Sequence, residues 1–454
     1  MGRRSLKLGL SLALALTAGC ASVGMPGEPP SPDLPPLPTG PELADPAPRE
    51  APPRDGTLPA LTLPPETGDV RALWVVRTAL LHPDSARTAV RRADDAGFNT
   101  LLVQVRGRGD AYFASALEPR AEPLAGAPAD YDPLATVLDE AGRRGLRVHA
   151  WMNMHVVASA VLPPEDPAHI ANERPEWLAV PRALGPELFG RDPGSPAYLE
   201  ALLAYTRANS SRVEGLYTSP THPAVQAHLQ AVVEDLLARY PVDGVHLDYL
   251  RFPAPEFDYS RATLEAFRDW IHRADGLVGA GELRAAEAQW LDDVFAFTDA
   301  FPAEWDAFRR AGVTATMERI YRAAKAGRPD LVVSAAVFAD ADDAHRSRFQ
   351  EWERWLASGI VDVAAPMAYT TDDAVFRSQI ARAASAADPG RVWAGLGIYR
   401  DSFEGAVDKG RLARELGVGG LALFSYDWAV GPEGTEAADG DPYLFRFSGA
   451  AFGR

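Results

Sequence analysis

The sequence has almost no cysteine. The single Cys20 cannot form an intrachain disulfide, so the fold must be stable without one, and a metal site built from several thiolates is excluded. Positive charge is also scarce: 45 Lys and Arg stand against 62 Asp and Glu, which gives a formal net charge of −17. This balance argues against a nucleic-acid-binding protein, and against binding of an acidic polymer by overall charge alone.

Several common catalytic motifs are missing. The sequence contains no Gly-x-Ser-x-Gly and no His-Glu-x-x-His, and no glycine-rich dinucleotide loop follows the first predicted strand, at residues 71–77. His149 and His155 do not have a recognised metal-ligand spacing. We therefore expect neither a metal ion nor an organic cofactor. After the first twenty residues, no apolar run is long enough to suggest a transmembrane helix.

The first twenty residues predict an export signal. Three basic residues in the first seven precede an apolar run at residues 8–15, and Leu-Thr-Ala-Gly-Cys follows at 16–20. This resembles the lipobox of bacterial lipoproteins, in which the cysteine is lipidated and becomes the new N-terminus. We expect residues 1–20 to be a lipoprotein signal peptide, with Cys20 as a membrane anchor in the cell envelope, on a periplasmic or outer-membrane face. An ordinary cleaved signal peptide is the alternative.

Residues 21–68 predict a disordered, proline-rich linker. Paired prolines recur through it, at residues 29–30, 35–36, 52–53 and 64–65, and large apolar residues are few. Such a segment cannot bury enough surface to offset the entropy of ordering, and its prolines favour a semi-extended spacer. The globular part is therefore expected at residues 69–454.

Residues 69–454 alternate between strand and helix patterns. The eight predicted strands lie at residues 71–77, 100–106, 147–153, 242–253, 331–338, 361–369, 392–399 and 420–426. Near-continuous apolar strands separated by helices indicate an α/β fold, a (β/α)8 TIM barrel, with long insertions after the third and fourth strands. An open doubly wound sheet is the alternative fold.

The fourth strand is the centre of the predicted site. Asp248, Tyr249 and Arg251 come at its end, and Pro253 stops it. Active sites of TIM barrels lie at the carboxyl ends of the strands, so Asp248 is the first candidate for catalysis. We expect Arg251 or Arg106 to keep Asp248 charged, as a nucleophile or as a stabiliser of positive charge.

Polar and aromatic side chains occur near the ends of the other strands. Those expected to bind substrate are Gln104, Arg106, Tyr112, His149, Trp151, Asn153, Tyr249, Arg251, Met367, Tyr369, Tyr426 and Trp428. Aromatic faces mixed with acids and arginines on one rim suggest a carbohydrate cleft. Three of these residues also have a structural interpretation: Arg106 as the partner of a nearby acid, and His149 and Trp151 as core residues.

Glycoside hydrolysis usually needs a second carboxylate facing the first. The candidates for this partner of Asp248 are Asp110 after the second strand, Asp340 after the fifth and Asp427 after the eighth. Each of the three could equally cap a helix, so the sequence leaves the choice open.

Several segments together resemble the bacterial glycosyl-hydrolase-like family ten. The matching segments are Arg-Ala-Leu-Trp-Val at 71–75, Gln-Val-Arg at 104–106, Gly-Asp-Ala-Tyr at 109–112, Asp-Pro-Leu at 132–134, Gly-Leu-Arg-Val-His-Ala-Trp-Met-Asn at 145–153 and Asp-Gly-Val-His-Leu-Asp-Tyr-Leu-Arg-Phe-Pro at 243–253. The resemblance implies a TIM barrel that hydrolyses glycosidic bonds, with the glycan strands of peptidoglycan as substrate. Many members have two acids in tandem where this chain has Asp248 and Tyr249, so a non-catalytic glycan-binding barrel is the alternative function.

Overall fold

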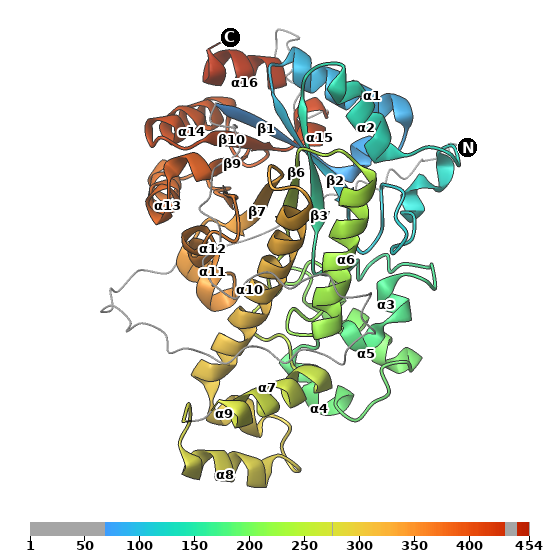
Figure 1. Cartoon of the computed structure of the whole chain (residues 1–454), viewed down its shortest axis with the longest axis vertical. Helices are drawn as coiled ribbons and strands as arrows, with labels where there is room; N and C mark the ends of the chain where they lie inside the picture. The colour runs from blue at the N-terminus through green and yellow to red at the C-terminus, as the bar shows by residue number, and fades with distance from the viewer. Residues whose placement is uncertain (1–68, 275, 432–442, 454) are drawn as a thin grey trace, which may run out of the picture.

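The computed structural model describes residues 69–274, 276–431 and 443–453 (Figure 1). The predicted signal peptide, the lipidation of Cys20 and the linker at 21–68 lie outside the described residues and stay predictions. None of the described helices combines the length and the apolar character needed to cross a membrane.

Eight parallel strands form a closed barrel, which confirms the predicted (β/α)8 fold. In chain order they are β1 (Val70–Val75), β2 (Thr100–Arg106), β3 (Arg147–Asn153), β6 (Gly244–Asp248), β7 (Val332–Phe338), β8 (Val363–Met367), β9 (Trp393–Gly397) and β10 (Gly420–Phe424). Each strand pairs with the next, and β10 closes the barrel by pairing with β1, with Val70 opposite Gly420.

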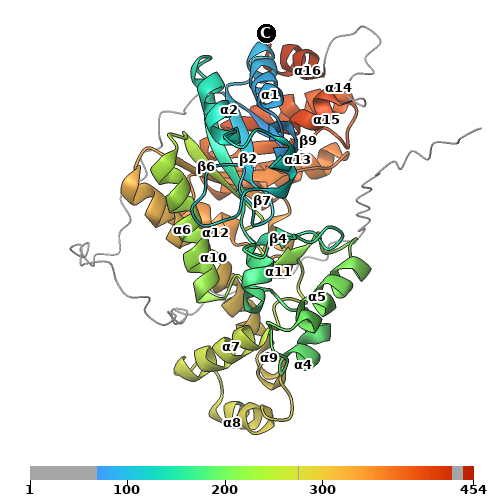
Figure 2. The ribbon, with the colours of Figure 1, turned by 90° about the vertical axis from the view of Figure 1, so that its right-hand side faces the viewer.

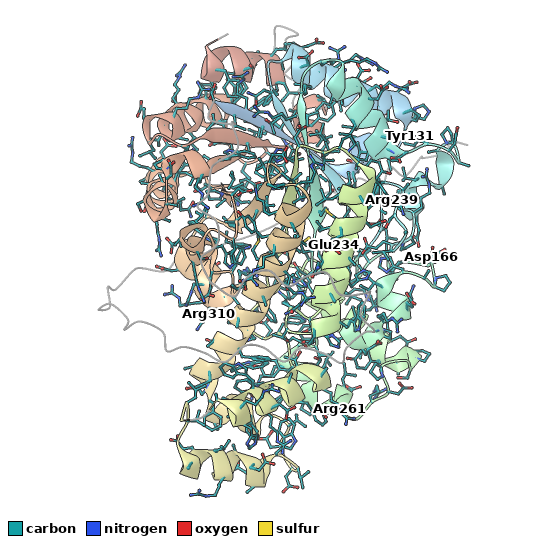
Figure 3. All side chains as sticks on the ribbon, viewed as in Figure 1. Tyr131, Asp166, Glu234, Arg239, Arg261 and Arg310 are labelled. Carbon is teal, nitrogen blue, oxygen red and sulfur yellow. The ribbon has the colours of Figure 1, made fainter. Side chains whose placement is uncertain are left out.

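Helices surround the barrel on the outside (Figure 1). They are α1 (Pro83–Asp95), α2 (Pro133–Gly142), α6 (Pro223–Arg239), α10 (Pro302–Gly327), α11 (Ala341–Ser347), α12 (Trp352–Ser358), α13 (Asp373–Ala386), α14 (Phe403–Glu415), α15 (Tyr426–Val430) and α16 (Tyr443–Phe452). On α6, Glu234 and Arg239 are exposed (Figure 3), whereas Leu229 and Val233 are buried in the core. The helix thus turns an apolar side to the barrel.

The start of α1 differs from expectation. Its cap is His82, whose Nδ1 accepts a hydrogen bond from the Asp84 N–H, although Asp84 and Ser85 are residue types that more often cap helices. Pro83 follows at the first helical position, where its missing N–H costs nothing. The helix therefore begins one residue before Asp84.

The barrel interior is a packed core, because side chains alternate along each strand. On β1, Ala72 and Trp74 belong to an interior cluster with residues of the other strands, whereas Leu73 and Val75 pack in the larger cluster that includes the helices. The Trp74 indole donates to Nε2 of His246 at 3.1 Å. These two buried polar groups therefore satisfy each other.

Two insertions extend from the same end of the barrel (Figures 1 and 2). The first, between β3 and α6, holds the antiparallel strands β4 (Val156–Ala158) and β5 (Leu216–Tyr217) and the helices α3 (Ile170–Glu173), α4 (Gly185–Leu188) and α5 (Pro196–Ala208). The second, between β6 and α10, holds α7 (Arg261–Arg273), α8 (Ala280–Gln289) and α9 (Ala296–Ala300). Because they follow β3 and β6, both insertions begin at the carboxyl ends of the strands, where the site was predicted.

Candidate active site

Asp248 is the last residue of β6 and lies opposite Asn153, the last residue of β3. Its side chain is almost completely buried: the residue is 8% exposed. Oδ2 accepts a hydrogen bond from the Trp151 indole at 3.1 Å, and Oδ1 accepts one from the Tyr249 N–H at 2.7 Å. Tyr249 has a left-handed φ of 52°, so the chain turns sharply just after the carboxyl group. The two donors hold the carboxyl group in one orientation.

Burial raises the pKa of Asp248 to about 6, although the Tyr249 N–H, Arg251 and Trp151 all act to lower it. The expected lowering of this pKa by a nearby arginine is present but is outweighed by burial. Arg251 itself pairs with another acid, Glu214, whose negative charge raises the pKa of Asp248. Desolvation is therefore the dominant effect.

Arg251 is buried and pairs with Glu214, a carboxylate that the sequence did not reveal. Its Nη2 donates to Oε1 of Glu214 at 2.8 Å, and its guanidinium lies 4.8 Å from the ring centroid of Tyr249 and 5.0 Å from that of Phe338. The Tyr217 hydroxyl donates to the other Glu214 oxygen at 2.8 Å. Burial raises the pKa of Glu214, but Arg251 and Tyr217 outweigh it, so this pKa is below its ordinary value.

The predicted partner acids have other contacts. Asp340 is the N-cap of α11 and accepts from the N–H groups of Asp342 and Asp343 at 3.0 and 2.9 Å. Asp427 lies in the short helix α15 and accepts from the Ser425 hydroxyl at 2.7 Å. Asp110 accepts from the Arg108 N–H at 2.6 Å. Capping accounts for the placement of Asp340, so its predicted catalytic role lacks support in the geometry.

Arg106 is a structural residue, which corrects its expected role in substrate binding. It is fully buried and donates from Nε and Nη2 to the carboxylate of Glu118, at distances down to 2.6 Å. Its Nη1 donates to the carbonyl oxygens of Asn153 and Met154. These bonds tie β2 to the end of β3, so the guanidinium is not available to a ligand.

His149 is also part of the core and not of the rim. It is fully buried, and its ring lies 5.5 Å from that of Trp393, the first residue of β9. A side chain at Gly244 would collide with the His149 ring, because an added Cβ would lie 2.6 Å from Nδ1. This position is deep in the barrel, two residues before Trp151, so the prediction that His149 binds substrate is wrong.

Tyr426 and Trp428 face the helices and not the barrel mouth. The eighth strand ends at Phe424, two residues earlier than predicted, and both aromatic residues lie on α15. Tyr426 is buried in the main core, and the Trp428 ring packs edge to face on Tyr443 of α16 at 5.3 Å. Their expected contacts with substrate are therefore replaced by contacts that fix the C-terminal helix.

Tyr369, which was expected to bind substrate, lies near Asp248 and packs with two further aromatic residues. The Tyr369 ring stacks on Phe424 at 5.6 Å and meets Tyr399 edge to face at 6.0 Å. Asp248 is among the groups that raise the pKa of Tyr369 above its ordinary value, after burial itself. Tyr399 is 39% exposed, and Met367 is partly exposed. These rings give the mouth of the barrel an aromatic surface.

Gln104 lies two residues before the end of β2, Tyr112 follows that strand, and Asn153 is the last residue of β3. Gln104 accepts from Arg77 at 2.8 Å, and Asn153 donates from Nδ2 to the carbonyl of Gly107 at 2.9 Å. Tyr112 is buried, with Asp110 and Arg77 among its electrostatic neighbours. Within the described ranges, no group of three or more His, Cys, Asp or Glu side chains could hold a metal ion.

Comparison with known proteins places this barrel in a family. The family described as glycosyl hydrolase-like 10 matches residues 69–399, so the match ends before β10, the strand that closes the barrel. The glycosyl hydrolase YngK of Bacillus subtilis is 24% identical over 333 residues, covering 66% of this chain and 54% of the relative. The glycosyl hydrolase DigH of Escherichia coli O6:H1 is 23% identical over 303 residues, covering 60% of this chain and 55% of the relative. The chain thus spans about half the length of these relatives.

Solved structures with the same fold include two glycoside hydrolases. The glycoside hydrolase domain of PgaB (BpsB) from Bordetella bronchiseptica has a TM-score of 0.54 at 16% identity, covering 78% of this chain and 94% of that one. The β-galactosidase Gan42B from G. stearothermophilus has a TM-score of 0.54 at 14% identity, covering 85% of this chain and 56% of that one. At such low identity these likenesses concern the fold, whereas the family match covers most of the sequence. The chain belongs to the glycosyl hydrolase-like 10 family.

Proposed function

We propose that this protein is a glycoside hydrolase that cleaves glycosidic bonds in the glycan strands of peptidoglycan, with Asp248 as the general acid. The observation that carries the proposal is the Asp248 carboxyl group itself. It is fixed at the carboxyl end of a barrel strand by Trp151 and Tyr249, and burial raises its pKa to about 6. A carboxyl group with this pKa keeps its proton in mildly acidic solution and can donate it to a leaving oxygen.

Glu214 is the proposed second carboxylate. Its pKa is lowered and that of Asp248 is raised, which is the division expected for a charged group and a proton donor in one site. Asp248 would protonate the glycosidic oxygen as the bond to the anomeric carbon breaks. Glu214 would either attack that carbon or take a proton from the attacking water, according to the separation of the two carboxyl groups.

The aromatic surface supports a sugar as the ligand. Tyr369, Tyr399 and Phe424 pack against one another beside Asp248, and Tyr399 is exposed. Apolar ring faces with a few fixed polar groups are typical of ligand sites. The peptidoglycan substrate rests on the family resemblance and on the predicted lipid anchor at Cys20, which would hold the barrel in the cell envelope beside the cell wall.

The proposal is tested with purified cell-wall sacculi, intact and stripped of stem peptides by an amidase. The wild-type protein is compared with Asp248→Asn and with Asp340→Asn, which changes only a helix cap, and the release of reducing ends is followed. Release by wild type and Asp340→Asn, but not by Asp248→Asn, is the expected result. If wild type binds the glycan but releases no reducing ends, the protein is instead a glycan-binding barrel.

A further inference from the structure

Two arginines come together at the ends of β1 and β2. Arg77 follows β1 and begins the short 3-10 helix η1 (Arg77–Leu80), and its Nη1 donates to Gln104 of β2 at 2.8 Å. Its side chain lies across Gly107, where an added Cβ would be only 2.7 Å from the Arg77 Cδ. The glycine therefore leaves the space that Arg77 occupies. Arg108 is the next residue after Gly107.

These two guanidinium groups have no acid partner among the described residues, unlike many other described arginines. In the described part of the chain, neither forms a salt bridge, and the Arg108 guanidinium donates no hydrogen bond; Arg251, by contrast, pairs with Glu214 at 2.8 Å. Burial lowers the pKa of Arg108, and the positive charge of Arg77 lowers it further. The Arg77 side chain thus lies against the residue before Arg108, and two partly buried cations repel each other there, an arrangement that an anion between them would stabilise.

The nearby Asp110 does not neutralise the pair. Its Oδ1 accepts the backbone N–H of Arg108 at 2.6 Å, and no described guanidinium lies within ion-pair distance of its carboxylate. Asp110 does raise the pKa of Arg108, but less than burial and Arg77 lower it. The pKa of Arg108 therefore stays below its ordinary value, although the whole chain carries a net charge of −17.

The arginine pair lies close to the proposed catalytic carboxyl group. Asn153 is opposite Asp248 in the sheet, and its Nδ2 donates to the carbonyl of Gly107, the residue before Arg108. The strand β3 alone separates β2 from β6, so the end of β2, which Arg108 follows, lies roughly 10 Å from β6, the strand of Asp248. Arg108 also lowers the pKa of Tyr249, the residue after Asp248, which places its charge on the same side of the barrel mouth.

Asn153 offers a second contact for a ligand. Its Oδ1 is buried and has no hydrogen-bond partner among the described residues. A buried acceptor without a donor is costly, so a ligand that supplied a donor to this oxygen would be stabilised. This oxygen would accept a hydrogen bond from a hydroxyl or an amide N–H on the same sugar.

We propose that Arg77 and Arg108 form a subsite for a carboxylate carried by a sugar of the glycan, adjacent to the sugar whose bond is cleaved at Asp248. The inference rests on the proposed function and narrows its substrate class to acidic glycans. Planar guanidinium groups bind a carboxylate through paired, charge-assisted hydrogen bonds. Because the net charge of the protein opposes the approach of an anion, attraction for such a group has to be local, as it is here.

The test compares one glycan with and without its carboxylates. Amidase-stripped cell-wall glycan is used as prepared and after its carboxyl groups are reduced to alcohols, and kcat/KM is measured on both. For wild type, kcat/KM should be about 10- to 100-fold higher on the acidic form, and Arg108→Gln and Arg77→Gln should bring this ratio close to one. Arg108→Lys, which keeps the charge but not the planar fork, should give an intermediate ratio.

The control is Arg377→Gln, which removes one exposed arginine from α13 on the outside of the barrel and should leave the ratio unchanged. Polygalacturonate, a polymer of a uronic acid, is added as a competitor to show whether the subsite also accepts a carboxylate attached directly to the sugar ring. If it inhibits wild type but not Arg108→Gln, the subsite extends to uronic acids. An equal kcat/KM of wild type on both forms overturns the subsite and leaves the hydrolase intact.

A failure of the proposed hydrolase activity can be distinguished from a failure of the proposed carboxylate subsite. If neither glycan is cleaved, binding of short acidic and reduced glycan fragments is measured by calorimetry. At least tenfold tighter binding of the acidic fragment, lost in Arg108→Gln, supports the subsite without catalysis. Equal binding of the two fragments by wild type overturns it.

Discussion

Asp248 and Glu214 differ in their surroundings, although both interact with Arg251. Asp248 accepts hydrogen bonds from an indole and a backbone N–H, both neutral, whereas Glu214 accepts directly from the guanidinium and from a tyrosine hydroxyl. A charged donor stabilises a carboxylate more than neutral donors do. This difference explains why burial determines the pKa of Asp248 but not that of Glu214.

Asp248→Asn should remove a cost to stability that depends on pH. The folded carboxyl group titrates near 6 against an ordinary 3.8, so the folded state binds more protons between these values and stability falls as the pH rises through them. At 1.36 kcal/mol per pKa unit, the charged form costs roughly 3 kcal/mol above pH 6. The free energy of unfolding of Asp248→Asn relative to wild type should therefore rise by roughly 2–3 kcal/mol from pH 4 to pH 8, measured by denaturant titration. A constant difference would contradict the raised pKa.

Glu214→Gln should lower kcat on cell-wall glycan by about 100-fold or more, as expected for loss of a catalytic carboxylate. It should also leave Arg251 without its acid, so the pKa of Asp248 should fall and the pH above which activity declines should move down. Asp110→Asn and Asp340→Asn, the acids suggested by the sequence, serve as controls. If Asp110→Asn abolishes activity and Glu214→Gln does not, Asp110 is the second carboxylate.

At the scale of elements, the strands and the barrel could be predicted, because a buried parallel strand is a long apolar run. The ranges 100–106 and 147–153 coincide with β2 and β3. Glu214 could not be found in this way, since it precedes β5, a strand of two residues inside a long insertion. The role of Arg106 likewise depends on Glu118, whose position relative to the end of β2 is set by the tertiary fold and not by local pattern.

The two-stranded sheet of β4 and β5 positions Glu214 and Tyr217, and Gly215 allows its two strands to approach closely. A Cβ at Gly215 would lie 2.2 Å from the carbonyl oxygen of Ala158 on β4. Gly215→Ala should therefore push the two strands apart, displace Glu214 and reduce glycan cleavage, with a stability cost of about 1–3 kcal/mol.

Gly281→Ala is the matched control for this two-stranded sheet. Gly281 lies in α8, where an added Cβ meets nothing within 4 Å, so alanine should leave activity unchanged and slightly favour the helix. Both variants are compared by thermal melting and by release of reducing ends. Normal activity of Gly215→Ala would mean that the two-stranded sheet does not determine the position of the carboxylate.

At the scale of the whole molecule, two buried histidines connect parts of the chain that are far apart in sequence. His246 of β6 accepts from Trp74 of β1 and is within 2.9 Å of the Ser334 hydroxyl on β7. His155 lies 3.1 Å from the Thr218 hydroxyl and so joins the start of the first insertion to its end. Because Nε2 of His246 accepts a hydrogen bond from the Trp74 indole, the neutral imidazole carries its proton on Nδ1. Protonation of Nε2 would place its N–H against the indole N–H, and the hydrogen bond would be lost.

These histidines should make the fold sensitive to acid. Burial lowers the pKa of both to about 3, from 6.5, so the unfolded chain takes up protons first and stability is lost as the pH falls from 6.5 toward 3. Each histidine lowers the free energy of unfolding by about 1.4 kcal/mol for every pH unit of this fall. Between pH 6 and 4, the protonation of Asp248 in the folded state has the opposite effect and offsets the contribution of one histidine. His246→Gln should reduce the loss of unfolding free energy over that range by about 1.4 kcal/mol per unit, whereas exposed His82→Gln should not. Parallel curves for wild type and His246→Gln would show that the barrel interior does not govern acid unfolding.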